Sequence, residues 1–172
     1  RGKSGSGKSL LLRAIADLDP NSGEVRLDQL RRDSMPAPDW RRLVCYAAAE
    51  SGWWLGLVGQ HFVDPAGAVG GLIRLGFSPD ALEWPVTRLS TGEKQRLALL
   101  RAMAAAPRVL LLDEPTSALD TEATARVESI LHEKLAGGVI IVMVTHDKAQ
   151  AARMSERAYL MEAGRLAPDA HG

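Results

Sequence analysis

The residues with the clearest chemistry lie at the start of the chain, where residues 2–9 have the sequence GKSGSGKS. This segment, here called the phosphate loop, fits the pattern G-x-x-x-x-G-K-[ST], whose glycines let the backbone turn with positive φ and aim successive N–H groups at one anion. We expect a helix to begin at about Lys8, so that the positive end of its dipole faces the same anion. Lys8 would then reach the outer phosphates of a nucleotide, and the Ser9 hydroxyl would bind Mg²⁺. A flexible glycine–serine linker is the alternative interpretation, but the apolar residues that follow predict a helix.

Two acidic residues follow an apolar strand predicted at residues 108–113. Because ligands collect at the carboxyl ends of the strands of a parallel sheet, Asp113 would lie beside the phosphate loop and bind Mg²⁺ directly or through water. Glu114 could orient and deprotonate a water molecule that attacks the γ-phosphate. A strand that simply ends in solvated acids is the alternative, and the phosphate loop argues against it.

A histidine follows another apolar run, at residues 139–145. A parallel strand there would bring His146 to the same edge of the sheet, where it could hydrogen-bond the γ-phosphate and hold the attacking water in place. The other histidines have no such placement and are interpreted as ordinary: His61, His132 and His171.

A second anion site is predicted where another helix begins. Ser90 and Glu93 form an S-x-x-E capping box. Ser90, Thr91 and Gly92 place backbone N–H groups at the N-terminus of that helix. An ordinary capped helix explains the same residues, so this segment is informative only together with the other three elements.

Strands alternate with helices along the chain and would position these elements. The run at residues 139–145 is almost continuously apolar, as in a parallel sheet that is covered on both faces. The pattern predicts an α/β fold with a mainly parallel sheet, into which residues 53–88 are inserted as a small helical subdomain. Strands are expected at 24–28, 43–48, 108–113, 139–145 and 158–162, and helices at 8–18, 90–106, 121–136 and just after Asp147.

Length and composition suit a single domain. The chain has 172 residues, and its 21 basic and 21 acidic residues balance, which argues against a surface that coats nucleic acid. The one cysteine, Cys45, lies in an apolar run and is interpreted as buried and inert; it allows no internal disulfide, as in a reducing compartment. No apolar run approaches about 18 residues, so no membrane span is expected.

In this order, the four elements resemble those of the ATP-binding cassette (ABC) family, and in particular the nucleotide-binding subunits of ABC transporters. GKSGSGKS is similar to the Walker A motif, LSTGEKQR to the signature motif with Thr91 in place of its usual first glycine, and VLLLDEP to Walker B with Glu114 in the catalytic place. Residues 117–120 (SALD) resemble the D-loop, His146 the switch histidine, and residues 162–165 (EAGR) the usual end of the family's domain. The likeness covers essentially the whole chain.

The resemblance implies a P-loop NTPase core of the ABC type, ATP and Mg²⁺ as ligands, and ATP hydrolysis coupled to transport. Two cassettes, expected as a homodimer, would pair head to tail, with each ATP between Walker A of one copy and the signature of the other. An integral membrane transporter subunit would be a further partner, and no nucleic acid is expected to bind. The chain itself would lie on the cytoplasmic face of a bacterial inner membrane. Residues 1–172 would form one ABC ATPase domain, with residues 1–50 and 89–172 as its core. The catalytic residues would be Glu114 and His146; ATP would contact Ser4, Gly5, Ser6, Gly7, Lys8, Ser9, Leu10, Ser90, Thr91, Gly92, Glu93 and Asp120; and Mg²⁺ would be bound by Ser9, Asp113 and Glu50.

Two features depart from the family's pattern. After the strand at 43–48 the family usually has a glutamine that contacts Mg²⁺, whereas this sequence has Ala49 there and Glu50 next, and we hypothesise that Glu50 takes the glutamine's role. A phosphate loop also normally follows a strand. Here only Arg1 precedes the loop. We therefore expect the first strand of the fold upstream of the sequence as given, together with the family's adenine-stacking aromatic residue.

The pair Trp53–Trp54 follows at the place where family members receive a helix of the membrane subunit. A role in the core suits the pair equally well, since aromatic anchors serve both purposes. Two other functions also stay open. One is a soluble ABC ATPase in DNA repair or translation, which is disfavoured because such proteins carry long coiled coils or two cassettes. The other is an N-terminally truncated cassette with little activity.

Overall fold

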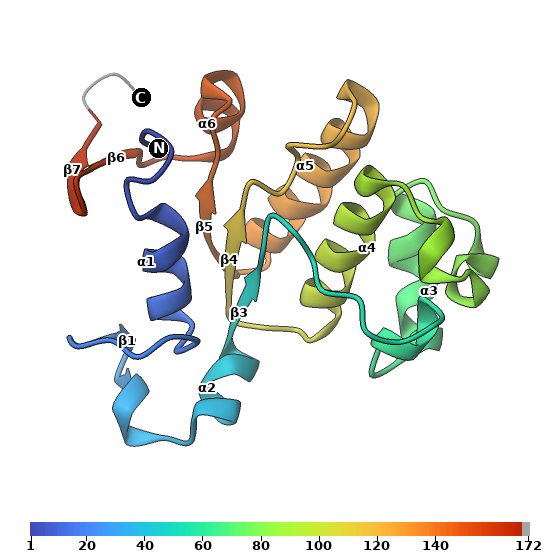
Figure 1. The fold of residues 1–172 in the computed structure, drawn as a ribbon, viewed down its shortest axis with the longest axis horizontal. Coiled ribbons are helices and arrows are strands. Elements are labelled where there is room, and N and C mark those ends of the chain that lie inside the picture. Colours follow the sequence, from blue (N-terminus) through green and yellow to red (C-terminus); the bar gives the residue numbers. More distant parts are fainter. Residues whose placement is uncertain (170–172) are drawn as a thin grey trace.

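Three parallel strands form the centre of the computed structural model, which describes residues 1–169 (Figure 1). They are β3 (Val44–Ala47), β4 (Val109–Asp113) and β5 (Ile140–Val144), in the spatial order β3-β4-β5. Val109 of β4 pairs with Val44 on one side and with Ile140 on the other. This parallel sheet, flanked by helices, confirms the predicted α/β fold class.

Helices surround the sheet, and short elements complete the chain. The longest helix, α5, has 16 residues, and within residues 1–169 none of the helices is long and apolar enough to cross a membrane. The helices are α1 (Lys8–Ile15), α2 (Ala37–Leu43), α3 (Pro65–Arg74), α4 (Thr91–Ala104), α5 (Thr121–Ala136) and α6 (Lys148–Met154). The short elements are the strands β1 (Arg26–Leu27), β2 (Leu30–Arg31), β6 (Tyr159–Glu162) and β7 (Arg165–Pro168), and the 3-10 helices η1 (Arg32–Ser34), η2 (Gly59–His61), η3 (Pro79–Glu83) and η4 (Val86–Arg88).

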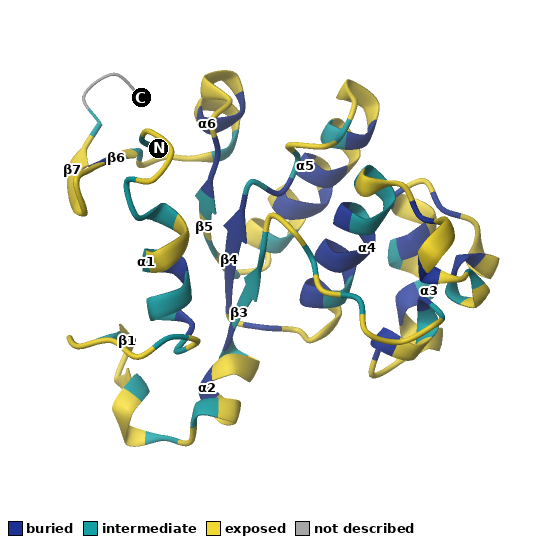
Figure 2. Cartoon of the chain, viewed as in Figure 1, coloured by how far each residue is buried: buried dark blue, intermediate teal, exposed yellow. Residues whose placement is uncertain are grey.

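The central strand β4 is buried along its whole length (Figure 2). Its side chains alternate between two hydrophobic clusters. Val109 and Leu111 join the cluster that contains side chains of α1 and α2. Leu110 and Leu112 join the other, which contains side chains of α3, α4 and α5. Successive side chains of a strand point to opposite faces, so α1 and α2 cover one face of the sheet, and α4 and α5 the other.

The two longest helices begin at the residues that the sequence predicts. Ser90 Oγ accepts a hydrogen bond from Glu93 N at 3.2 Å, and Ser90 N donates to Glu93 Oε2 at 2.8 Å, which confirms the capping box of α4. Asp120 Oδ1 accepts from Ala123 N at 2.8 Å and caps α5. The positive φ of Gly138, 86°, follows the end of α5, as expected from the glycine pair there.

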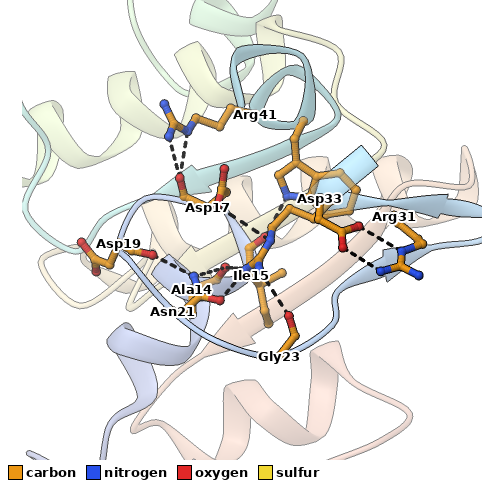
Figure 3. A network of polar contacts seen from close by, with 11 residues as sticks. Ala14, Ile15, Asp17, Asp19, Asn21, Gly23, Arg31, Asp33 and Arg41 are labelled. Carbon is orange, nitrogen blue, oxygen red and sulfur yellow. Dashed lines mark hydrogen bonds and ion pairs between the residues drawn. The ribbon is translucent and has the colours of Figure 1, made fainter. Parts of the chain in front are cut away.

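Helix α1 is shorter than predicted. It ends at Ile15, since residue 17 already has a left-handed backbone. Side chains of α2 donate hydrogen bonds to backbone carbonyl groups at this end of α1. Trp40 Nε1 donates to Ile15 O at 2.9 Å, and Arg41 Nη2 donates to Asp17 O at 2.6 Å. These bonds tie α2 to α1. Figure 3 shows the wider network around them, with Ala14, Asp19, Asn21, Gly23, Arg31 and Asp33.

Strand β5 is not covered on both faces, contrary to the prediction from its apolar sequence. It is an edge strand of the three-stranded sheet, and Ile140 and Val142 are 48% and 39% exposed. A cavity of about 440 Å³ lies between α1, β5 and β6. On the far side of this cavity, Arg1 pairs with β6, since Arg1 N donates to Tyr159 O at 2.6 Å and Met161 N donates to Arg1 O at 2.7 Å.

The last strand of the structure, β7, is absent from the prediction, which ended at residue 162. Ala163 and Gly164 have φ of 46° and 76°, so they form a two-residue turn whose twist suits a hairpin. Glu162 pairs with Arg165 across it. The strand predicted at 24–28 has only two paired residues, in β1.

Residues 53–88 contain α3 and the 3-10 helices η2 to η4, as expected for a helical stretch. Leu72 of α3 and Phe77 lie in the same hydrophobic cluster as Leu97 of α4 and Leu110 of β4. Helix α4 therefore connects this stretch to the sheet. The division of the domain into a core and a subdomain stays a prediction.

An ion pair between Glu128 of α5 and Arg153 of α6 joins the two helices, and its carboxylate is nearly buried. Arg153 donates to both carboxylate oxygens of Glu128, at 2.8 and 3.0 Å. Gln150 Nε2 donates to Glu128 Oε1 at 3.1 Å. The side chain of Glu128 is 11% exposed and that of Arg153 is 49% exposed. The hydrogen bond from Arg153 holds the pKa of the Glu128 carboxyl below its usual range, against the opposing effect of burial.

Glu128→Gln is expected to destabilise the protein by about 1–2 kcal/mol at neutral pH, because it weakens hydrogen bonds to a charged group whose partner is half-exposed. The pKa is lower in the folded than in the unfolded state. The stabilisation is therefore complete above the ordinary glutamate pKa of about 4.3 and is lost as the pH falls through the folded value. Urea unfolding at about pH 7 and about pH 3 measures the difference in the free energy of unfolding between wild type and Glu128→Gln. This difference should be smaller at the lower pH. An equal difference at both would contradict this role.

Candidate functional site

The phosphate loop has the conformation that its glycines predict. Gly5 and Gly7 have φ of 76° and 103°, and Gly7 is the N-cap of α1, which begins at Lys8. The Lys8 ammonium group lies inside the curve of the loop, where it donates to the carbonyls of Gly2 and Lys3, both at 2.8 Å. The loop therefore holds a positive charge at the point where it would hold phosphates.

Further observations fit an anion at this loop. Ser6 Oγ is buried and has no hydrogen-bond partner within the described residues, so a polar ligand could satisfy it. Gly2 is packed so closely against β6 that an added Cβ would lie 2.2 Å from Met161 O, which only glycine avoids. The other predicted ATP contacts of the loop are exposed: Ser4, Gly5, Ser9 and Leu10.

Glu114 and His146 follow neighbouring strands and lie together. Asp113 at the end of β4 pairs with Val144 at the end of β5, and Glu114 N extends the ladder by donating to Val144 O at 2.9 Å. His146 Nε2 lies 3.2 Å from Glu114 Oε1, and His146 N donates to Glu114 Oε2 at 3.4 Å. The structure brings these two residues to one edge of the sheet, as expected, while their catalytic roles stay predictions.

Asp113 has a hydrogen-bond partner that the sequence analysis missed. Its side chain is buried at the end of β4, and Tyr46 of β3 donates its hydroxyl to Asp113 Oδ2 at 3.0 Å. Burial first, and then the charge of Asp113, raise the pKa of Tyr46 to about 12, so the phenol keeps its proton and remains a donor at neutral pH. The contact depends on the register of β3 against β4, for which the sequence offers no signal.

The predicted magnesium ligands fit the ion by their chemistry. The Ser9 hydroxyl and the Asp113 carboxylate are hard oxygen donors of the kind that Mg²⁺ prefers. Glu50 lies exposed just beyond β3. Within the part of the chain that the structure describes, no group of three His, Cys, Asp or Glu side chains is placed to hold a metal. Mg²⁺ usually keeps several waters and takes phosphate oxygens, so one or two protein ligands suffice for it.

The predicted signature residues lie away from the phosphate loop. Residues 90–93 begin α4, which covers the face of the sheet opposite α1 (Figure 1). One chain therefore does not bring its loop and its signature to the same nucleotide. The Ser90 hydroxyl and the Glu93 carboxylate are used in the capping box, which leaves the N–H groups of Thr91 and Gly92 as donors for an anion. Asp120 is likewise used as the cap of α5.

The tryptophan pair separates into one packed and one exposed side chain. Trp53 packs against the core, whereas Trp54 is 70% exposed. His61 is buried beside them, and its Nε2 accepts from Trp54 N and Leu55 N, both at 3.1 Å. Its Nδ1 lies 3.1 Å from Leu57 O, so Nδ1 carries the proton and donates. The sequence gives no sign of this role, because the partners of His61 are backbone atoms, which leave no pattern in it. His132 is exposed, and His171 lies outside the described residues.

A groove of about 650 Å³ runs beside this turn. Arg101 of α4 lines it and donates from both terminal nitrogens to Gly52 O at 3.2 Å. Its guanidinium carbon lies 4.9 Å from the Trp53 ring and 5.1 Å from the Trp54 ring, within the range of cation–π contacts. Cys45 also lines the groove, and burial raises the pKa of its thiol, which fits an inert cysteine.

Known proteins resemble this chain over nearly its whole length. Residues 1–117 match the family model described as ABC transporter. An aliphatic sulfonates import ATP-binding protein of Pseudomonas syringae pv. syringae is 39% identical, over 98% of this chain and 63% of that protein. An Fe(3+) ions import ATP-binding protein of Streptomyces avermitilis is 37% identical, over 96% and 52%. A solved dimeric structure of a bacterial ABC transporter cassette has a TM-score of 0.80 and 25% identity, over 97% and 82%. The chain thus spans less than two thirds of the two curated relatives.

His61→Ala is expected to loosen the turn at residues 54–57, because two partly buried N–H groups lose their acceptor. Amide hydrogen exchange of Trp54 and Leu55, followed by NMR, should accelerate by about tenfold or more. His132→Ala, at an exposed position of α5, is the matched control and should leave both rates unchanged. Equal exchange rates in His61→Ala and wild type would contradict this role of His61.

Proposed function

Because the chain belongs to the ABC transporter family, we propose that it is an ATPase subunit that binds ATP, closes on a second cassette and powers a membrane transporter. One observation carries the proposal: Glu114 and His146 follow the C-terminal ends of β4 and β5, at the same end of the sheet as the start of α1 (Figure 1). His146 Nε2 lies 3.2 Å from Glu114 Oε1. A phosphate-binding loop and an acid–base pair at one edge are the parts that nucleotide hydrolysis needs.

In this proposal the residues act on the nucleotide through charge and position. The N–H groups of the phosphate loop and the Lys8 ammonium group neutralise the phosphates. Glu114 orients and deprotonates the attacking water, and His146, whose side chain is 57% exposed, donates to the γ-phosphate. When bound, Mg²⁺ supplies positive charge that stabilises the negative charge developing on the phosphates. Its proposed protein ligands are Ser9, Asp113 and Glu50.

We infer that the second cassette is another copy of this chain. The phosphate loop and residues 90–93 belong to helices on opposite faces of the sheet, so they cannot close on one nucleotide within a chain. A second copy in head-to-tail orientation offers the N-terminus of its α4 to the loop of the first. The solved cassette that resembles this chain is dimeric, which supports this arrangement.

The membrane subunit would dock at the groove beside Trp54. An exposed indole next to an apolar groove, with Arg101 in its wall, suits an amphipathic helix of a partner. The relatives are import ATP-binding proteins for different cargoes, aliphatic sulfonates and Fe(3+) ions, at nearly the same identity. We propose that the membrane partner selects the cargo and that this chain lies against it at the bacterial inner membrane.

Glu114→Gln is expected to lower ATP turnover by about a hundredfold or more, as for loss of a general base, while ATP binding survives. Phosphate release with Mg²⁺ and equilibrium ATP binding, both on the full chain, measure the two effects. Glu83→Gln, at an exposed position of η3, is the control and should keep wild-type turnover. Wild-type turnover in Glu114→Gln would show that Glu114 is not the general base.

Trp54→Ala is expected to reduce recovery of the membrane partner by about tenfold or more, since exposed tryptophans are frequent anchors of interfaces. The measurement is co-purification of a multispan membrane protein with the tagged chain from detergent extracts of the native host. Leu166→Ala, a similar change at an exposed site of β7, should not affect it. Unreduced recovery with Trp54→Ala, with ATP binding intact, would place the partner elsewhere.

A further inference from the structure

Gln95 of α4 is buried and uses both ends of its amide on the segment that follows β4. Its Nε2 donates to Glu114 O at 2.7 Å and to Ser117 Oγ at 3.2 Å. Its Oε1 accepts from Ala118 N at 3.1 Å, and only 7% of the residue is exposed. A buried amide that is bonded at both ends sets the distance between two elements, because either element moving away would leave a buried polar group unpaired.

The residue that Gln95 holds has an unusual backbone. Glu114 has a φ of 50°, in the left-handed region that residues with a Cβ rarely adopt. The peptide group before it is bound to β5, through Glu114 N and Val144 O at 2.9 Å. The peptide group after it is bound to Gln95, and also to Ser117 Oγ at 3.1 Å. These two anchors hold the backbone on both sides of the Glu114 side chain, whose Oε1 lies 3.2 Å from His146 Nε2.

A second contact joins the same two segments. A Cβ added to Gly92, in the first turn of α4, would lie 2.8 Å from Ala118 O and 3.4 Å from Leu119 Cδ2. Only glycine allows the helix to approach this backbone so closely. The first turn of α4 therefore cannot move toward residues 117–119 without displacing them.

We propose that Gln95 is a positioning residue for Glu114. Its amide holds the Glu114 carbonyl, and with it the direction of the Glu114 carboxylate, so that a displacement of α4 reaches Glu114. The inference rests on the proposed function, in which the start of α4 contacts the ATP bound by a second copy. In that dimer, contact of α4 with one nucleotide adjusts the general base that acts on the other.

Gln95→Met tests this, because methionine has a similar length and removes all three polar contacts. We expect kcat to fall about tenfold, as for one lost hydrogen bond to the positioned group, while KM for ATP stays within about twofold because the phosphate loop is unchanged. Gln95→Glu keeps the acceptor for Ala118 N and loses the donor to Glu114 O, so it should lower kcat as much. Gln29→Met, the same change at an exposed turn, should have no effect. Far-UV circular dichroism and ATP binding identify a variant that does not fold, and Gln95→Glu then carries the test.

The combination with Glu114→Gln shows whether Gln95 acts through Glu114. In that background Gln95→Met should change the residual turnover by less than about twofold, since residues that act as a unit are not additive. A further tenfold loss would overturn the inference, and so would wild-type kcat in both single variants of Gln95. A wild-type full chain without ATP turnover would overturn the proposed function, and this inference with it.

Discussion

The parallel pairing of β4 with both of its neighbours determines where Asp113, Glu114 and His146 of the candidate site lie. Leu110, Leu111 and Leu112 are fully buried, and each stabilises the sheet by about 1.5–3 kcal/mol because its apolar surface is removed from water. Because parallel strands end at the same edge, the acids after β4 emerge beside the histidine after β5. A shift of β4 by one residue would turn its side chains to the opposite faces and separate Glu114 from His146.

The same sheet separates the two predicted anion sites of the chain. Alternate side chains of β4 bind α1 and α2 on one face, and α4 and α5 on the other. The phosphate loop begins α1, and the signature residues begin α4. In the proposed dimer each face thus carries half of a closed nucleotide site, and a second copy brings the halves together. Gln95 of α4 hydrogen-bonds to the carbonyl of Glu114, directly after β4, so the start of α4 and the end of β4 are connected within one chain.

Features that depend on local pattern could be predicted from the sequence. The phosphate loop, the capping box at Ser90 and Glu93, and the cap of α5 at Asp120 rely on neighbours a few residues away. Register and docking could not be predicted. Tyr46 and Asp113 are 67 residues apart, and Gln95 and Glu114 are 19 apart. The open face of β5 was also missed, because an apolar strand has the same sequence whether or not a neighbour covers it.

The claim that one chain holds half of each nucleotide site is tested most directly by the mass of the full chain in solution. Light scattering should show one chain without nucleotide and two chains with Mg²⁺ and a non-hydrolysable ATP analogue, with return to one chain when the nucleotide is removed. The same single-chain mass under both conditions, in a protein that demonstrably binds the analogue, would contradict the account.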